Sequence, residues 1–170
     1  MSDARFSRRI MGKIVSIRPF AAMFYHPAMH SQEALQRNKA IVIRFNREVI
    51  EQGNEDAFRE LIAVDFVNRT AAPGTPNGPE GMLHTFNCVL RPALPDLTVT
   101  IHEQVAEGDK VTTRKTINGT LRGPLLGVDA TNERIQIEVI DIVRIENGRY
   151  AEHWGINTLP SVLAMLRSAG

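Results

Sequence analysis

The stretch Arg134–Ile156, RIQIEVIDIVRIENGRYAEHWGI, decides the fold of this chain. Apolar and polar side chains alternate from Arg134 to Glu146, which predicts a strand with one buried face. Asn147-Gly148 is a strong signal for a two-residue β-turn and predicts that Arg149–Ile156 returns as an antiparallel strand. A long β-hairpin is therefore the first element that the sequence predicts.

One face of the first hairpin strand is apolar apart from a single carboxylate, Asp141. Successive side chains of a strand point to opposite faces. The face that contains Asp141 otherwise holds only aliphatic side chains: Ile135, Ile137, Val139, Val143 and Ile145. A carboxylate inside a cavity is a candidate general acid or base, so Asp141 is the predicted catalytic residue. The alternative is a structural role, in which Asp141 accepts hydrogen bonds from a buried donor.

A two-residue turn also predicts the neighbours of Asp141, because directly opposed residues of a hairpin share a face. This register places Glu152 and Trp154 beside Asp141 and makes them candidate substrate-binding residues. Two acids in an apolar site disfavour double ionisation, so at least one of them is expected to have a raised pKa. The same register places His153 on the opposite face, beside Ile142, as a packed, interfacial or substrate-contacting residue.

The rest of the chain predicts an α+β domain with three N-terminal helices on one face of an antiparallel sheet. Amphipathic patterns and caps predict these helices before residue 92, and alternating patterns predict strands after residue 97. The predicted helices span residues 32–52, 55–62, 79–90 and 160–168, and the predicted strands span residues 97–107, 111–121, 134–146 and 149–156. A brief extended segment, residues 65–68, precedes the third helix.

Composition excludes several classes of protein. Residues 1–30 are basic and are predicted to form an extension outside the folded domain, residues 31–170; a transit peptide or an over-called start codon are the alternatives. The remaining chain has no basic excess for binding nucleic acid, and no apolar run is long enough to span a membrane. The single cysteine, Cys88, excludes an intrachain disulfide, and its apolar neighbours predict a buried thiol. We expect a cytoplasmic protein without a metal site.

Several short motifs resemble the SnoaL-like polyketide cyclases, which are also called ester cyclases and belong to the nuclear-transport-factor-2-like superfamily. The resemblance covers roughly residues 33–165. It rests on Asn38-Lys39-Ala40, Gln52-Gly53-Asn54, Asp65-Phe66-Val67, Pro95-Asp96-Leu97, residues 106–111, Asp141–Gly148 and Glu152–Gly155. It implies a cone-shaped, strongly curved sheet with helices over its concave face, a homodimer or homotetramer, and chemistry without a cofactor.

The resemblance also implies roles for individual residues. Asp141 matches the aspartate that acts as acid/base in an intramolecular aldol condensation, and Asn68 matches a polar residue that binds a substrate carbonyl. The ligand would be a small apolar compound that contains a carbonyl group. The chain departs from the family pattern at Leu121 and Arg69, which replace histidines.

Three functions are compatible with these residues. The first is a cofactor-free lyase or isomerase that cyclises or isomerises a carbonyl compound, with Asp141 as acid/base. The second is a non-catalytic domain that holds a small molecule or a partner in the same cone. The third is epoxide hydrolysis, which needs an Asp–Arg–Asp relay, and Arg114 is the mid-strand arginine that could bind substrate there.

Overall fold

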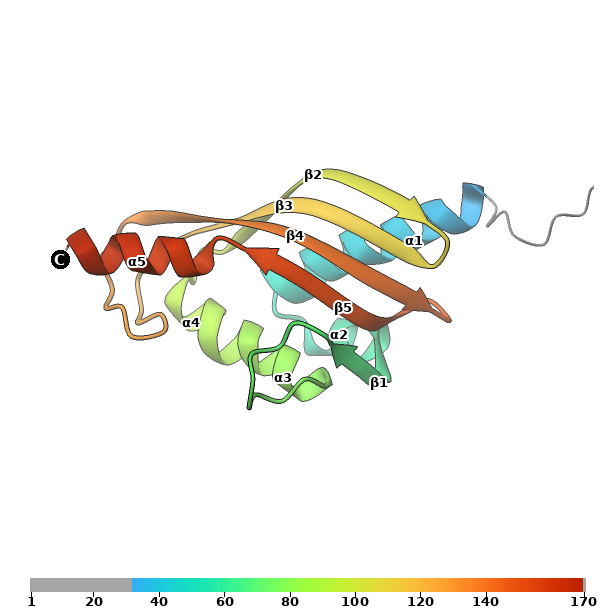
Figure 1. Cartoon of the computed structure of the whole chain (residues 1–170), viewed down its shortest axis with the longest axis horizontal. Helices are drawn as coiled ribbons and strands as arrows, with labels where there is room; N and C mark the ends of the chain where they lie inside the picture. The colour runs from blue at the N-terminus through green and yellow to red at the C-terminus, as the bar shows by residue number, and fades with distance from the viewer. Residues whose placement is uncertain (1–31, 170) are drawn as a thin grey trace, which may run out of the picture.

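The computed structural model of the chain describes residues 32–169 (Figure 1). The helical elements are α1 (Gln32–Arg44), η2 (Phe45–Glu51), α2 (Glu55–Leu61), α3 (Pro79–His84), η3 (Thr85–Leu90), α4 (Arg91–Ala93) and α5 (Leu159–Ala169). The strands are β1 (Ile62–Asn68), β2 (Thr98–Glu107), β3 (Lys110–Thr120), β4 (Arg134–Glu146) and β5 (Arg149–Asn157). The π-helical segments η2 and η3 continue the α-helices before them. Three helical rods therefore precede β2, as predicted: the first is α1 with η2, the second is α2, and the third is α3 with η3 and α4.

The strands form one curved, open sheet in the order β1-β5-β4-β3-β2. Strands β2 to β5 are an antiparallel meander, which confirms the α+β prediction. The brief extended segment predicted at residues 65–68 belongs to β1, which pairs in parallel with β5, so the sheet is mixed rather than purely antiparallel. The three helical rods cover one face of this sheet, which we call the inner face (Figure 1).

The junction between the first two rods follows the capping chemistry that the sequence predicts. Gly53 has φ of +69°, a conformation that glycine adopts without steric cost. The Asn54 side chain then caps α2 by accepting a hydrogen bond of 3.0 Å from the Ala57 backbone N–H. The Arg91 guanidinium donates to the carbonyl groups of Val49 and Glu51 at the end of η2, which ties the third rod to the first.

An aromatic cluster joins the helices to the inner face of the sheet. Phe45 is 2% exposed and stacks on Tyr150 of β5, with ring centroids 4.3 Å apart. The rings of Phe58 and Phe86 contact the same phenylalanine from the second and third rods. Burial, together with the charge of Asp141, raises the pKa of Tyr150 well above its ordinary value, so this phenol stays neutral in the folded protein.

The predicted hairpin turn is correct, but the register beyond it is wrong by one residue. Asn147 and Gly148 both have positive φ, and Ile145 pairs with Tyr150 as expected. A β-bulge then inserts Ala151, so that Arg144 pairs with Glu152. Tyr150 and Ala151 are both buried, at 3% and 4% exposed, and every later residue of β5 points to the face opposite to the predicted one.

Two further expectations concern the surface and the ends of the chain. Cys88 is exposed rather than buried, because it lies on the outward side of η3 while Leu90 and Met82 point to the core. The predicted basic extension, residues 1–30, lies outside the described residues. Among residues 32–169, no helix combines the length and the apolar character that crossing a bilayer requires.

Candidate functional site

Asp141 lies on the inner face of β4, beneath the helices, as the alternation predicted. It is 5% exposed and pairs with Thr113 of β3 on one side and with Gly155 of β5 on the other. Its Oδ2 atom forms an ion pair with the ammonium of a neighbouring lysine, whereas its buried Oδ1 atom has no hydrogen-bond partner among the described residues. Buried carboxylate oxygens are nearly always satisfied, so an unpaired one marks a place where a proton donor can bind.

The neighbouring lysine is Lys115 of β3, which is not among the candidate site residues predicted from the sequence. It is 5% exposed, and its Nζ lies 2.7 Å from Asp141 Oδ2, the length of a charge-assisted hydrogen bond. Nζ also donates to Asn46 Oδ1 at 2.8 Å. The amide of Asn46, the second residue of η2, donates in turn to the Val42 carbonyl. The first helical rod therefore fixes the lysine, and the lysine fixes the carboxylate.

His153 approaches Asp141 from the other side, as a result of the bulge. Its Nε2 is 3.8 Å from Asp141 Oδ2, and its Nδ1 is 3.1 Å from Asn68 Oδ1. The Thr70 backbone N–H also donates to Asn68 Oδ1, which identifies that atom as the acceptor and His153 Nδ1 as the nitrogen that carries a proton. The 3.8 Å gap is too long for a direct hydrogen bond.

Gly155 makes room for this histidine. A Cβ atom at position 155 would lie 2.9 Å from Cε1 and 3.1 Å from Nε2 of the His153 ring. The absence of a side chain directly opposite Asp141 therefore lets the imidazole lie beside the carboxylate. His153 has 18% of its side chain exposed, against 6% for Asp141, so the network is closer to solvent at the histidine end.

The charge state of Asp141 differs from the sequence expectation. Burial has the largest single effect on this carboxyl and by itself would raise its pKa, but the Lys115 ammonium and the His153 side chain together outweigh it. The net result is that they hold the pKa of Asp141 below its usual value. The expectation of a raised pKa assumed a second acid, and a cation stands there instead. Asp141 is therefore an anion at neutral pH.

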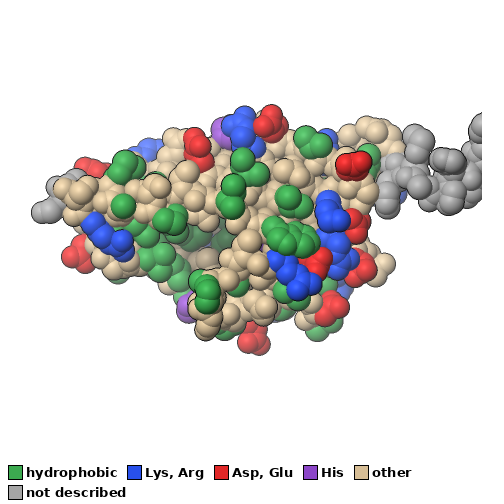
Figure 2. Space-filling model, viewed as in Figure 1, with side chains coloured by type: hydrophobic (Ala, Val, Ile, Leu, Met, Phe, Trp, Pro, Cys, Tyr) green, Lys and Arg blue, Asp and Glu red, His purple; other side chains and the backbone are tan. Residues whose placement is uncertain are grey.

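Three of the residues predicted for the site lie on the outer face of the sheet instead: Glu152, Trp154 and Arg114. Glu152 is on the outer face, where it binds Arg69 and Arg144, and these two arginines lower its pKa by hydrogen bonding. Trp154 pairs with Ile142 on the same outer face. The one-residue bulge explains both errors. Figure 2 shows basic and acidic side chains clustered at the right of the view, over the paired ends of β4 and β5.

Arg114 is also on the outer face, half-exposed and paired with Glu103 at 2.8 Å. It therefore does not contact Asp141, and the geometry does not provide the Asp–Arg–Asp relay that epoxide hydrolysis needs. Of the two residues that depart from the family pattern, Leu121 is fully buried in the core, and Arg69 is the partner of Glu152. Within residues 32–169, no group of three His, Cys, Asp or Glu side chains could hold a metal ion.

Residues 40–164 match the family model of the SnoaL-like polyketide cyclases. The chain belongs to this family. Among solved structures it is similar to IdmH from Streptomyces antibioticus, a candidate polyketide cyclase, with 31% identity, a TM-score of 0.67, and coverage of 76% of this chain and 98% of that one. It is also similar to TsrD from Streptomyces laurentii, with 27% identity, a TM-score of 0.68, and coverage of 77% and 95%.

A third similar structure is that of AclR from Streptomyces galilaeus, a candidate hydroxylase that shares 21% identity with the chain. The two structures have a TM-score of 0.68, and the match covers 79% of this chain and 98% of AclR, which shows a common fold. None of the curated proteins compared with the chain matches it. The chain thus has the SnoaL-like fold.

Proposed function

We propose that the chain is a cofactor-free acid/base enzyme of the SnoaL-like cyclase type. Its substrate would be a small, apolar carbonyl or polyketide-like compound, and the reaction an aldol cyclisation or an isomerisation that begins with removal of a proton next to the carbonyl. The observation that supports this most directly is Asp141 Oδ1, a buried oxygen of an ionised carboxylate that has no partner among the described residues. The similarity to IdmH supports the class of substrate.

In the proposed reaction Asp141 is the base, because its carboxylate is ionised at neutral pH and one of its oxygens has no partner among the described residues. Its lowered pKa makes it a weak base, so removal of the proton also depends on stabilisation of the charge that develops on the carbonyl oxygen. His153, with Nδ1 bound to Asn68, presents Nε2 to the same carboxylate and is placed to accept or return the proton from the solvent side. Asn68 then positions the histidine, in addition to the substrate contact that the family resemblance implies.

Proton exchange tests the proposed function without knowledge of the natural substrate. We expect the wild-type protein to accelerate the exchange of α-protons for deuterium in D₂O, measured by proton NMR on a panel of ketones of increasing size, from acetophenone to fused-ring diketones. The acceleration should saturate with ketone concentration. A ketone that binds, as shown by line broadening, but exchanges only at the uncatalysed rate would favour the non-catalytic binding domain instead.

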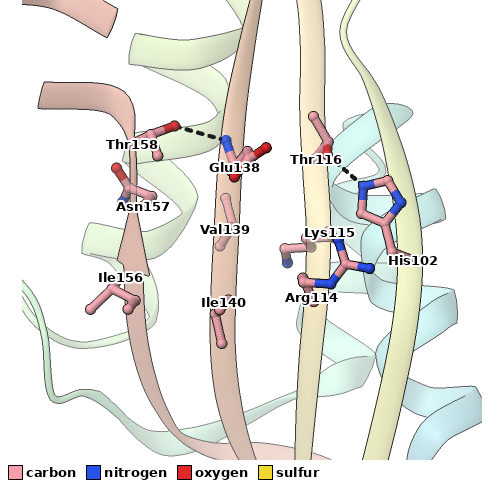
Figure 3. A pocket seen from close by; sticks show the side chains of 10 residues that line it. All are labelled: His102, Arg114, Lys115, Thr116, Glu138, Val139, Ile140, Ile156, Asn157 and Thr158. Atoms are coloured by element: carbon pink, nitrogen blue, oxygen red, sulfur yellow. Dashed lines mark hydrogen bonds between the residues drawn. The ribbon is translucent and has the colours of Figure 1, made fainter. Parts of the chain in front are cut away.

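Self-association is proposed from the outer face of the sheet. A groove of about 190 Å³ crosses β2 to β5 on this face, and Figure 3 shows Ile140 and Ile156 side by side in it. These two isoleucines are 44% and 71% exposed. Arg114 and Glu138 line the same groove, so a second copy of this face offers both apolar contact and charges of either sign. We propose that a second copy of the chain covers the groove.

Replacing Ile156 with glutamate should convert the oligomer into a monomer at micromolar concentration, because it introduces a charge where the apolar faces meet. Size-exclusion chromatography with light scattering measures the mass directly. Val64→Glu is the matched control, since Val64 is 90% exposed on β1 and does not line the groove. A wild-type protein that is already monomeric would contradict the proposal.

A further inference from the structure

Lys115 is a buried cation that the acid/base role of Asp141 does not by itself require. Lysine is almost never fully buried unless it is paired, and a structural ion pair could be replaced by apolar residues at little cost. Yet Lys115 lies on the inner face of β3, 5% exposed, with Nζ bound to Asp141 Oδ2 and Asn46 Oδ1. Both partners are acceptors, so the geometry fits the ammonium form, which has only N–H donors.

Two of the three N–H donors of Lys115 are accounted for by these partners. No third acceptor is found for Nζ among the described residues. The Oδ1 atom of Asp141, on the same carboxylate that the lysine contacts, also has no partner there. A free donor and a free acceptor thus lie next to each other within one ion pair, on the face that the helices cover.

We infer that Lys115 is a second catalytic residue, which donates a hydrogen bond to the carbonyl oxygen of the substrate while Asp141 Oδ1 removes the proton from the adjacent α-carbon. The inference rests on the proposed function and narrows its substrate to an enolisable ketone. The carbonyl oxygen of this ketone must reach Lys115 while its α-carbon reaches Asp141 Oδ1. An α-carbon and its carbonyl oxygen are separated by one carbon atom, and the two oxygens of Asp141 are likewise separated by one carbon.

The step balances without any further reactant. The α-C–H bond breaks and its proton passes to Asp141 Oδ1, while its electron pair forms a C=C bond. The π-electrons of the C=O bond move onto oxygen, which becomes an enolate. The negative charge thus passes from the carboxylate to the enolate oxygen, and the Lys115 ammonium has an anionic partner before and after transfer. A fixed cation at the place where charge develops is an efficient way to lower a barrier in a site that excludes water.

Asn46 is a positioning residue in this scheme. Its side-chain oxygen accepts from Lys115, and its amide is anchored to the Val42 carbonyl, 2.8 Å away. This arrangement leaves the ammonium little freedom to turn toward Asp141 Oδ1, so that oxygen stays free for the proton. The π-helical segment η2 is what brings Asn46 over the lysine, since π-helical turns shift side chains relative to a regular α-helix.

The test measures α-proton exchange of the ketone that wild type exchanges fastest. Lys115→Met should lower the exchange rate by about 10²–10³, mainly in kcat, because the interaction strengthens as charge develops on oxygen. Lys115→Arg should recover part of this loss because it retains a cationic donor. Lys110→Met, which removes an exposed lysine from the same strand, is the matched control and should exchange at the wild-type rate.

Lys115→Gln provides a second test if Lys115→Met does not fold. Glutamine keeps an N–H donor for Asp141 but has no charge, and we expect exchange to be slower by at least about 10-fold. A Lys115→Met or Lys115→Gln variant that exchanges at the wild-type rate would overturn the role of the lysine and leave the proposed function intact. An imine at Lys115, trapped by borohydride and detected by mass spectrometry, would also overturn it in favour of a nucleophilic lysine. Failure of wild type to exchange any ketone would refute the proposed function itself.

Discussion

Replacement of Asp141 by asparagine is expected to slow α-proton exchange by about 10²–10⁴, the usual contribution of a general base. Asparagine has nearly the same shape but cannot accept the proton. The same change leaves the buried ammonium of Lys115 without its counterion. Removing one partner of a buried ion pair typically costs about 3–5 kcal/mol, so we also expect a clear loss in the free energy of unfolding, measured by denaturant titration.

The stability part of this prediction depends on pH in a definite direction. The pKa of Asp141 is lower in the folded protein than in the unfolded chain, so its stabilising effect is complete above the ordinary aspartate pKa of about 3.9. It is lost as the pH falls through the folded-state value. The difference between wild type and Asp141→Asn should therefore be largest near pH 7 and should shrink in acid.

The double variant Asp141→Asn/Lys115→Met separates the two effects. Removing both charges of a buried pair costs much less than removing one, so the double variant should recover most of the stability and none of the activity. If the two single changes were instead additive in the free energy of unfolding, the ion pair would not couple these residues. In that case the loss of stability in Asp141→Asn would need another explanation.

Replacement of Phe45 by alanine should lower the free energy of unfolding by about 3–5 kcal/mol, the range for a large aromatic side chain removed from a packed core. Phe45 is 2% exposed and contacts rings from both later helical rods as well as Tyr150. Such a loss is a large part of the about 5–15 kcal/mol that stabilises a typical domain. Thermal and denaturant unfolding followed by circular dichroism would measure it.

Val64→Ala is the comparison for Phe45→Ala, because Val64 is 90% exposed on β1. A surface substitution of this kind should change stability by no more than about 0.5 kcal/mol. Equal effects of the two changes would mean that the aromatic cluster contributes little. We also expect Phe45→Ala to slow ketone exchange at temperatures where the protein is folded, since Asn46, which holds Lys115, follows it directly in η2.

The sequence predicted most of the fold because its strongest signals are local. Asn147-Gly148 specifies a turn with two positive φ angles, and the alternation in β4 specifies which side chains face the core. The bulge has no comparable signal. Ala151 is compatible with either face, and its insertion is evident only in the structure, from the shift in strand pairing and from the burial of both Tyr150 and Ala151. The error in the predicted neighbours of Asp141 follows from that single residue.

Lys115, the ion-pair partner of Asp141, could have been identified from the sequence as a candidate site residue. Lys115 alternates with Val111, Thr113 and Ile117 in the strand before, so it lies on the apolar face by the same reasoning that identified Asp141. That the two residues meet depends on the register between β3 and β4, which the intervening loop of residues 121–133 does not specify. Contact with Asn46 depends further on how the first helix crosses the sheet, and no local pattern encodes this.

The bulge at Ala151 also affects how this family can evolve. Deletion of that one codon would remove the bulge but keep the present pairs, Arg144 with Glu152 and Asp141 with Gly155, so His153 would stay beside Asp141. A relative of the same length whose hairpin lacked the bulge would instead turn Glu152 and Trp154 toward Asp141 and His153 away from it, without any substitution. Two homologues with identical residues in the aligned columns could carry different chemistry. Equivalent positions in this part of the family should therefore be assigned by strand pairing and not by alignment column.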